Sequence, residues 1–142
     1  MTRFNDALPS GSALDNPERL VDYLRSNLAE SVIYRPDVEN FIVVHLNTRR
    51  NAIGLEIVST GTLDTLLVHA REVFKSAIVT NASAIALAHN HPSGDPSPSE
   101  ADIKITRDLI RAGQLLKIEV LDHIVVGNPN HTSLRSLGFF YS

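Results

Sequence analysis

Residues 82–102 read ASAIALAHNHPSGDPSPSEAD, a short apolar run that ends in two histidines and passes into a loop of Pro, Ser and Gly. The run from Ala82 to Ala88 is small and apolar throughout, which is typical of a buried strand in a sheet covered on both faces. The loop spans Pro92 to Pro98. Apolar residues at helical spacing follow it: Ile103, Ile105, Leu109 and Ile110. We therefore predict a strand, a loop and then a helix that ends at Gly113.

Elements of both kinds precede and follow this segment. Asn16-Pro17-Glu18 predicts a helix start, with Asn as the N-cap residue and Pro in the first helical position. A polar turn, Asn47 to Asn51, lies between two β-branched runs and indicates a hairpin. The further predicted elements are a helix from Pro17 to near Glu30, strands at Phe41–Leu46 and Ile53–Thr60, a helix at His69–Ile78 and a strand at Ile118–Val126. This order predicts one α/β domain with a mixed β-sheet flanked by helices.

The break Arg35-Pro36-Asp37 divides the chain into two predicted regions. Residues 1–36 are expected to hold a flexible N-terminal tail, formed by the polar residues 1–15, and one helix. Residues 37–142 are expected to form the main domain. Apolar side chains close to the C-terminus are predicted to pack on the sheet or on a second subunit of a homodimer: Phe139, Phe140 and Tyr141.

Length, composition and charge exclude several classes of protein. The chain has 142 residues, too few for an eight-stranded α/β barrel of about 250 residues, so barrel-type metal hydrolases are excluded. It has no cysteine, which excludes disulfides, thiolate nucleophiles and zinc sites with sulfur ligands. The net charge of −3 gives no general attraction to nucleic acid. Neither a signal peptide nor a membrane-spanning run is recognisable, so we expect a cytoplasmic protein without membrane contact.

Two histidines and one aspartate form a candidate metal site. His89 and His91 lie two residues apart at the end of the predicted strand, so their side chains share a face. Asp102 lies near the start of the following helix, and the loop can return it to that strand end. Two imidazoles and a carboxylate suit Zn²⁺ where thiolates are lacking, and three protein ligands leave a fourth position for water.

The same aspartate has a second interpretation. Ser99 and Asp102 have the spacing of a helix-start box, in which Ser99 caps the helix and Asp102 lies in its first turn. Capping and metal binding can coexist, because the cap fixes the helix start that aims Asp102. From spacing alone, the two interpretations are equally good.

The spacing His-x-His, seven residues, Ser, two residues, Asp resembles the JAMM signature of the MPN+/JAB metalloproteases. His89-Asn90-His91-Pro92-Ser93-Gly94 with Pro98-Ser99 and Asp102 closely resembles the version found in the RadC family. Further segments that resemble this family, in order along the chain, are Thr60-Gly61-Thr62-Leu63, Val68-His69-Ala70-Arg71-Glu72-Val73-Phe74 and Leu121-Asp122-His123-Ile124-Val125-Val126-Gly127. Full-length RadC proteins also carry a helical region of helix-hairpin-helix type, and any DNA contact made there is not carried over to this chain.

The resemblance implies an MPN/JAB-like (cytidine-deaminase-like) fold and a zinc-dependent hydrolase acting on a peptide or isopeptide bond of a protein or peptide substrate. It implies that His89, His91 and Asp102 hold Zn²⁺. It also implies two catalytic residues: Glu39 as the general base and Ser99 as a hydrogen-bond donor to the oxyanion. Glu56 is the other acidic candidate, but it lacks the motif context.

A non-catalytic alternative remains open, in which a metal stabilises the fold and the domain binds DNA or a protein partner in DNA repair. A nucleic-acid partner would need a local basic patch, for which the candidates are Arg49, Arg50, Lys104, Arg107 and Arg111. The pair Asp122-His123 interrupts an apolar strand, so we expect it to be hydrogen-bonded, either within the core or in support of the site. An HNH nuclease and a zinc deaminase are excluded, since neither motif is present.

Overall fold

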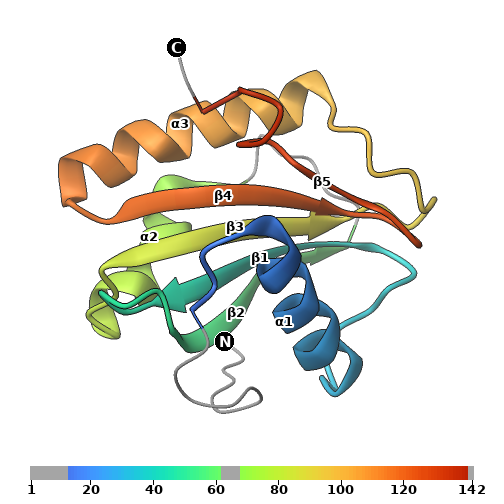
Figure 1. Ribbon diagram of the computed structural model, residues 1–142, viewed down its shortest axis with the longest axis horizontal. Coiled ribbons are helices and arrows are strands. Elements are labelled where there is room, and N and C mark those ends of the chain that lie inside the picture. Colours follow the sequence, from blue (N-terminus) through green and yellow to red (C-terminus); the bar gives the residue numbers. More distant parts are fainter. Residues whose placement is uncertain (1–12, 62–67, 141–142) are drawn as a thin grey trace.

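The computed structural model describes residues 13–61 and 68–140, which form one layered α/β structure around a five-stranded sheet (Figure 1). The strands, in their order across the sheet, are β2 (Ala52–Gly61), β1 (Glu39–Leu46), β3 (Ala84–Asn90), β4 (Glu119–Val126) and β5 (His131–Ser133). β3 and β4 are parallel, whereas the other neighbouring strands are antiparallel. The helices are α1 (Pro17–Ala29), α2 (Ala70–Val79) and α3 (Glu100–Leu116). The predicted mixed sheet flanked by helices is confirmed.

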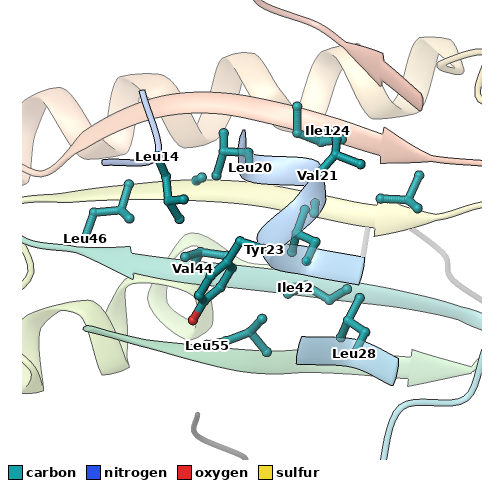
Figure 2. Close-up of a cluster of buried hydrophobic side chains, with 14 of the residues drawn as sticks. Leu14, Leu20, Val21, Tyr23, Leu28, Ile42, Val44, Leu46, Leu55 and Ile124 are labelled. Atoms are coloured by element: carbon teal, nitrogen blue, oxygen red, sulfur yellow. The ribbon is translucent and has the colours of Figure 1, made fainter. Parts of the chain in front are cut away.

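Successive side chains of the central strands point to opposite faces of the sheet, and a hydrophobic core lies on each face. Even-numbered residues such as Ile42 and Val44 of β1 pack with α1, in the cluster of Figure 2. Odd-numbered residues such as Phe41 and Val43 pack with α2 and α3 on the opposite face. Because both faces are covered, all seven residues of β3 are buried, as its small apolar sequence predicts.

The first helix forms where its start signal predicts, and it belongs to the same core as the strands. The side chain of Asn16 accepts a hydrogen bond from the Arg19 N–H at 2.9 Å. Leu20 and Leu24 are 2% and 1% exposed, and burial of each contributes roughly 1.5–3 kcal/mol. The predicted boundary after residue 36 thus lies between α1 and the strands in the sequence, although α1 packs on these strands in the fold.

Only the end of the predicted flexible tail lies among the described residues. There Leu14 is buried in the core around α1, and its N–H bonds to the carbonyl of Arg50 at 2.8 Å. Residues 1–12 of that tail, and Thr62-Leu63 and Tyr141 further along, lie outside the described residues. Within the described residues, no helix combines the length and the apolar composition needed to cross a bilayer.

Three predicted element boundaries were wrong. α3 continues past Gly113 to Leu116, because a glycine is needed inside the helix where it meets the backbone: a Cβ there would lie 2.4 Å from the Ile118 carbonyl oxygen. β3 starts two residues later than predicted and extends through Asn90, since the ladder with β4 continues to Val126. β5 (His131–Ser133) is a short edge strand in a part of the chain for which no element was predicted.

Candidate metal centre

The two histidines lie at the end of the central strand, on the face covered by α2 and α3. His89 continues the alternation of Ile85 and Leu87, and its side chain therefore points to that face. His91 follows directly after β3, and its backbone N–H bonds to the carbonyl of Val126 at 2.9 Å, which extends the strand path by one residue. The pairing with β4 thus brings both imidazoles to one place.

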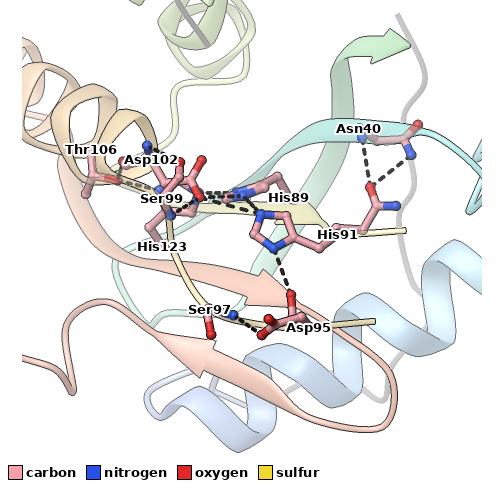
Figure 3. A network of polar contacts seen from close by, with 10 residues as sticks. Asn40, His89, His91, Asp95, Ser97, Ser99, Asp102, Thr106 and His123 are labelled. Atoms are coloured by element: carbon pink, nitrogen blue, oxygen red, sulfur yellow. Dashed lines mark hydrogen bonds and ion pairs between the residues drawn. The ribbon is translucent and has the colours of Figure 1, made fainter. Parts of the chain in front are cut away.

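The start of α3 supplies the carboxylate, and a reciprocal capping box fixes it. The hydroxyl of Ser99 accepts the Asp102 N–H at 3.0 Å, and Asp102 Oδ2 accepts the Ser99 N–H at 2.8 Å. The predicted cap is confirmed. Figure 3 shows the carboxylate directed from α3 toward the two imidazoles.

Three potential ligand atoms converge between the strand and the helix. Nε2 of His89 lies 3.0 Å from Nε2 of His91, and Asp102 Oδ2 lies 3.2 Å and 3.5 Å from these two nitrogens. His89 and Asp102 are buried, whereas 17% of the His91 side chain is exposed, so the centre is open on that side. His89, His91 and Asp102 could hold a metal ion, and they are the group predicted from their spacing.

Electrostatics favour a negatively charged carboxylate at this centre. Burial raises the pKa of Asp102, but the hydrogen bond and charge that His89 provides in its protonated form, together with the N–H of Ser99, lower it by more. The pKa of Asp102 therefore lies well below its ordinary value. An ionised carboxylate beside two imidazole nitrogens is a suitable donor set for Zn²⁺ and related divalent ions, so the residues fit such an ion.

The loop after β3 orients His91. Nδ1 of His91 lies 2.8 Å from the backbone carbonyl oxygen of Asp95, which can only accept, so Nδ1 carries a hydrogen, and in the neutral ring Nε2 then has the free lone pair. The loop is held against the end of β4, where a Cβ on Gly127 would lie 2.3 Å from the carbonyl oxygen of Gly94. Sequence reasoning missed Asp95, because a backbone carbonyl carries no residue-type signal.

Glu39 is the first residue of β1 and is half-buried. Alternation places it on the face of Phe41, whose partner across the ladder is His89. Continuing that antiparallel register by two residues sets Glu39 opposite His91. No hydrogen bond or ion pair within residues 13–61 and 68–140 joins Glu39 to the three ligand candidates, and its catalytic role stays a prediction.

The interrupted strand β4 brings two more polar side chains to the site. Nε2 of His123 lies 2.8 Å from Nδ1 of His89, and the other ring nitrogen of His123 contacts the hydroxyl of Thr106. Burial lowers the pKa of His123 well below its ordinary value, so its imidazole is neutral. Asp122 points elsewhere and accepts from Ser133 at 2.6 Å, so only His123 supports the site. Sequence reasoning missed Thr106, although its place one turn after Asp102 puts it on the same helix face.

The remaining candidates lie outside the centre. Glu56 accepts a hydrogen bond from Ser76 at 2.6 Å, and Ser76 in turn contacts buried His45 at 2.9 Å. Asn90 points to the opposite face from its histidine neighbours, where its Oδ1 accepts the Asn40 N–H at 2.7 Å. His131 lies 4.0 Å from Glu18.

Acidic neighbours offset most of the candidate basic patch. On α3, Asp108 pairs with Lys104 at 2.9 Å and with Arg111 at 3.6 Å. In the hairpin turn, Arg50 pairs with Glu119 at 2.9 Å. Within the described residues, three of the five candidate basic side chains thus lie beside a carboxylate, which weakens the positive field there.

Comparison with known proteins gives a consistent match over most of the chain. The family model of the RadC-like JAB domain matches residues 14–139. A UPF0758 protein of Symbiobacterium thermophilum is 49% identical over 125 residues, which cover 88% of this chain and 51% of the relative. A UPF0758 protein of Moorella thermoacetica is 54% identical over 99 residues, covering 70% and 43%, and one of Methanosarcina mazei is 46% identical over 101 residues, covering 71% and 44%. The chain spans about half the length of these curated relatives.

Proposed function

The chain belongs to the RadC family of JAB-domain proteins, and on that premise we propose that it is a zinc-dependent hydrolase of the JAMM type, which cleaves a peptide or isopeptide bond. The observation that carries the proposal is the convergence of three potential ligand atoms, Nε2 of His89, Nε2 of His91 and Oδ2 of Asp102, within 3.0–3.5 Å of one another. When both imidazoles offer a lone pair on Nε2 and the carboxylate is ionised, one divalent metal ion can bind all three atoms.

Each residue of the centre has a distinct role in the proposed reaction. His89, His91 and Asp102 would hold Zn²⁺, which supplies a Lewis acid that acidifies water and polarises a carbonyl group. Glu39 takes the proton of the attacking water and delivers it to the leaving amine. Its register opposite His91, the most exposed of the three ligand candidates, suits this role.

Ser99 is suited to stabilise the oxyanion. Its oxygen accepts the Asp102 N–H, so the hydroxyl hydrogen is free to donate to a substrate. Ser99 is exposed, whereas the ligand candidate Asp102 beside it is buried. A donor at this position would stabilise the negative charge that forms on the carbonyl oxygen during attack.

The competing proposal is a metal-stabilised module without catalysis that binds DNA or a protein. A purely structural zinc site is usually closed by four protein ligands, whereas the cluster found in the described part of the chain has three and an exposed side. The paired basic residues of α3 also disfavour a DNA surface. Both observations favour the hydrolase.

Metal content and turnover measured together test the proposal. Elemental analysis of the purified protein should find about one zinc per chain, lost in His91→Ala and kept in His131→Ala. Hydrolysis is assayed with a library of fluorogenic peptides and a lysine-linked isopeptide. Glu39→Gln should keep the zinc and lose turnover by at least about 100-fold, because the base is gone while the ligands remain.

Two outcomes would contradict the hydrolase. A Glu39→Gln protein that turns over at the wild-type rate would remove Glu39 from the mechanism. A wild-type protein that takes up no zinc even when zinc is supplied would leave capping as the role of Asp102, and salt-sensitive DNA binding would then establish the competing proposal.

A further inference from the structure

A buried chain of hydrogen bonds runs from one candidate ligand back to another. It begins at Nδ1 of His89, which lies 2.8 Å from Nε2 of His123. Nδ1 of His123 contacts Oγ1 of Thr106, and Thr106 Oγ1 lies 2.7 Å from the backbone carbonyl oxygen of Asp102. Figure 3 shows Thr106 and His123 beside Asp102 and His89.

The last member of the chain fixes the direction of every hydrogen bond in it. The Asp102 carbonyl can only accept, so the hydroxyl of Thr106 donates to it. Because the single hydrogen of the Thr106 hydroxyl is used in this bond, Oγ1 can only accept from Nδ1–H of His123. In a neutral imidazole that donates through Nδ1, Nε2 has no hydrogen, so Nε2 of the buried His123 ring accepts from Nδ1–H of His89.

This direction decides which nitrogen of His89 can bind a metal. With Nδ1 carrying the hydrogen, the neutral imidazole has its lone pair on Nε2, the atom that faces Asp102. We infer that His123 and Thr106 are positioning residues that hold His89 in the tautomer with a bare Nε2 and thereby prepare the centre for its metal. The inference rests on the proposed function in that His89 is a ligand.

Packing prevents His89 from escaping this arrangement by rotation. The ring of Phe41 stacks on the His89 ring at an interplanar angle of 8° and meets the His123 ring edge-on at a centroid distance of 5.6 Å. His89 is 1% exposed. The hydrogen-bond chain selects the tautomer, and the packed rings keep the selected nitrogen aimed at the carboxylate.

A threonine is required because its hydroxyl donates and accepts at once. In Thr106→Val, Nδ1–H of His123 would point at a methyl group, and a buried donor without a partner is unfavourable. His123 would then place its hydrogen on Nε2 and donate to His89, whose own hydrogen would move to Nε2. The hydrogen on Nε2 would then occupy the lone pair with which His89 would bind a metal.

The tautomer is measured directly by NMR of the ¹⁵N-labelled histidine rings in metal-free protein at about pH 8.5, roughly two units above the ordinary imidazole pKa. The His89 signals are assigned from their absence in His89→Gln. Wild type and Thr106→Ser should show His89 protonated on Nδ1, and Thr106→Val should show it protonated on Nε2. Zinc affinity, from competition with a chelator, should fall roughly 10–100-fold in Thr106→Val and recover in Thr106→Ser.

Thr80→Val is the matched control, since Thr80, the C-cap residue of α2, makes the same bond through Oγ1 to the carbonyl one turn earlier, Ser76 at 2.8 Å, and within the described residues no recorded hydrogen bond joins its hydroxyl to a histidine. It should leave both the tautomer and the affinity unchanged. A Thr106→Val protein with His89 still protonated on Nδ1 would overturn the inference even if zinc binds normally. If wild type binds no zinc, the proposed function fails, while the tautomer still decides the inference.

Discussion

Asp102 uses a single carboxylate oxygen for two purposes. Its Oδ2 accepts the N–H of Ser99 at 2.8 Å and lies 3.2 Å from Nε2 of His89. Helix capping and metal binding are therefore compatible, because a carboxylate oxygen has more than one lone pair. Of the two interpretations that the spacing left equal, the cap is formed, and the same oxygen lies where it could also bind a metal ion.

The lowered pKa of Asp102 predicts an acid-sensitive stability at this residue. Because the folded-state pKa lies below the unfolded value, ionised Asp102 stabilises the fold fully above about pH 3.9 and loses this effect as the pH falls below that value. Hydrogen bonds to a charged group contribute about 1.5–3 kcal/mol. Asp102→Asn should thus destabilise the metal-free protein by about that amount at pH 7 and by less near pH 3, measured by urea unfolding with a chelator present.

Asp108→Asn provides the control for this pH dependence. Asp108 lies on the same helix, but its ion pairs with Lys104 and Arg111 are exposed. Surface pairs contribute about 0–1 kcal/mol, so this variant should unfold nearly as wild type at every pH. An Asp102→Asn penalty that does not shrink in acid would show that shape, and not charge, matters at residue 102.

At the scale of elements, the centre is built where a strand end, a loop and a helix start meet. β3 delivers His89 and His91, and the first turn of α3 delivers Asp102. The loop between them returns through the contact of Gly94 with Gly127, and it supplies the Asp95 carbonyl that orients His91. The position of the three ligand candidates therefore depends on where β3 ends and where α3 begins.

Loss of the α3 cap should weaken both the helix and the centre. Ser99→Ala removes the acceptor for the Asp102 N–H, which costs about 1 kcal/mol for a typical N-cap. Asn caps helices as well as Ser does, so Ser99→Asn should restore the stability. Urea unfolding of the metal-free proteins gives the free energies, and chelator competition should show weaker zinc binding in Ser99→Ala only. Equal stability of Ser99→Ala and wild type would mean that the box contributes nothing.

At the scale of the whole molecule, the sheet ties the N-terminal helix to the centre. Nη2 of Arg25, on α1, donates to the carbonyl oxygen of Pro129 at 3.0 Å, in the turn between β4 and β5. The backbone N–H of Asn128 in that turn bonds to the Gly94 carbonyl at 2.9 Å, next to Asp95. A chain of contacts thus connects α1 with the loop that orients His91, across the boundary predicted after residue 36.

Because a metal would join β3 to α3, its binding should stabilise the whole fold. Free zinc at 100 times its dissociation constant adds about 2.7 kcal/mol if only the native state binds it. For a domain of this size, each kcal/mol raises Tm by a few degrees, so an increase of roughly 5–15 °C is expected. Scanning calorimetry of wild type, His91→Ala and His131→Ala should show the increase in the first and third proteins. An equal increase in His91→Ala would place the zinc elsewhere.

Local patterns predicted much of this fold and of its candidate centre. The alternation that puts His89 and His91 on one face, and the three-residue spacing that makes Ser99 and Asp102 a capping box, follow from the backbone geometry of a strand and of a helix start. These arrangements involve neighbours in sequence, so the sequence by itself determines them. The exact element ends were less predictable: α3 passes Gly113 because of a backbone contact with Ile118.

Only the tertiary structure decided which distant residues meet. The parallel pairing of β3 with β4 sets Leu87 beside His123, and so brings His123 to His89 across 34 positions of sequence. The antiparallel register of β1 sets Phe41 beside His89 and, continued by two residues, sets Glu39 opposite His91. Strand register depends on how both faces of the sheet pack, which is a property of the whole core and not of any short segment. For that reason the ligand set can be read from one stretch of the chain, whereas its supporting partners cannot.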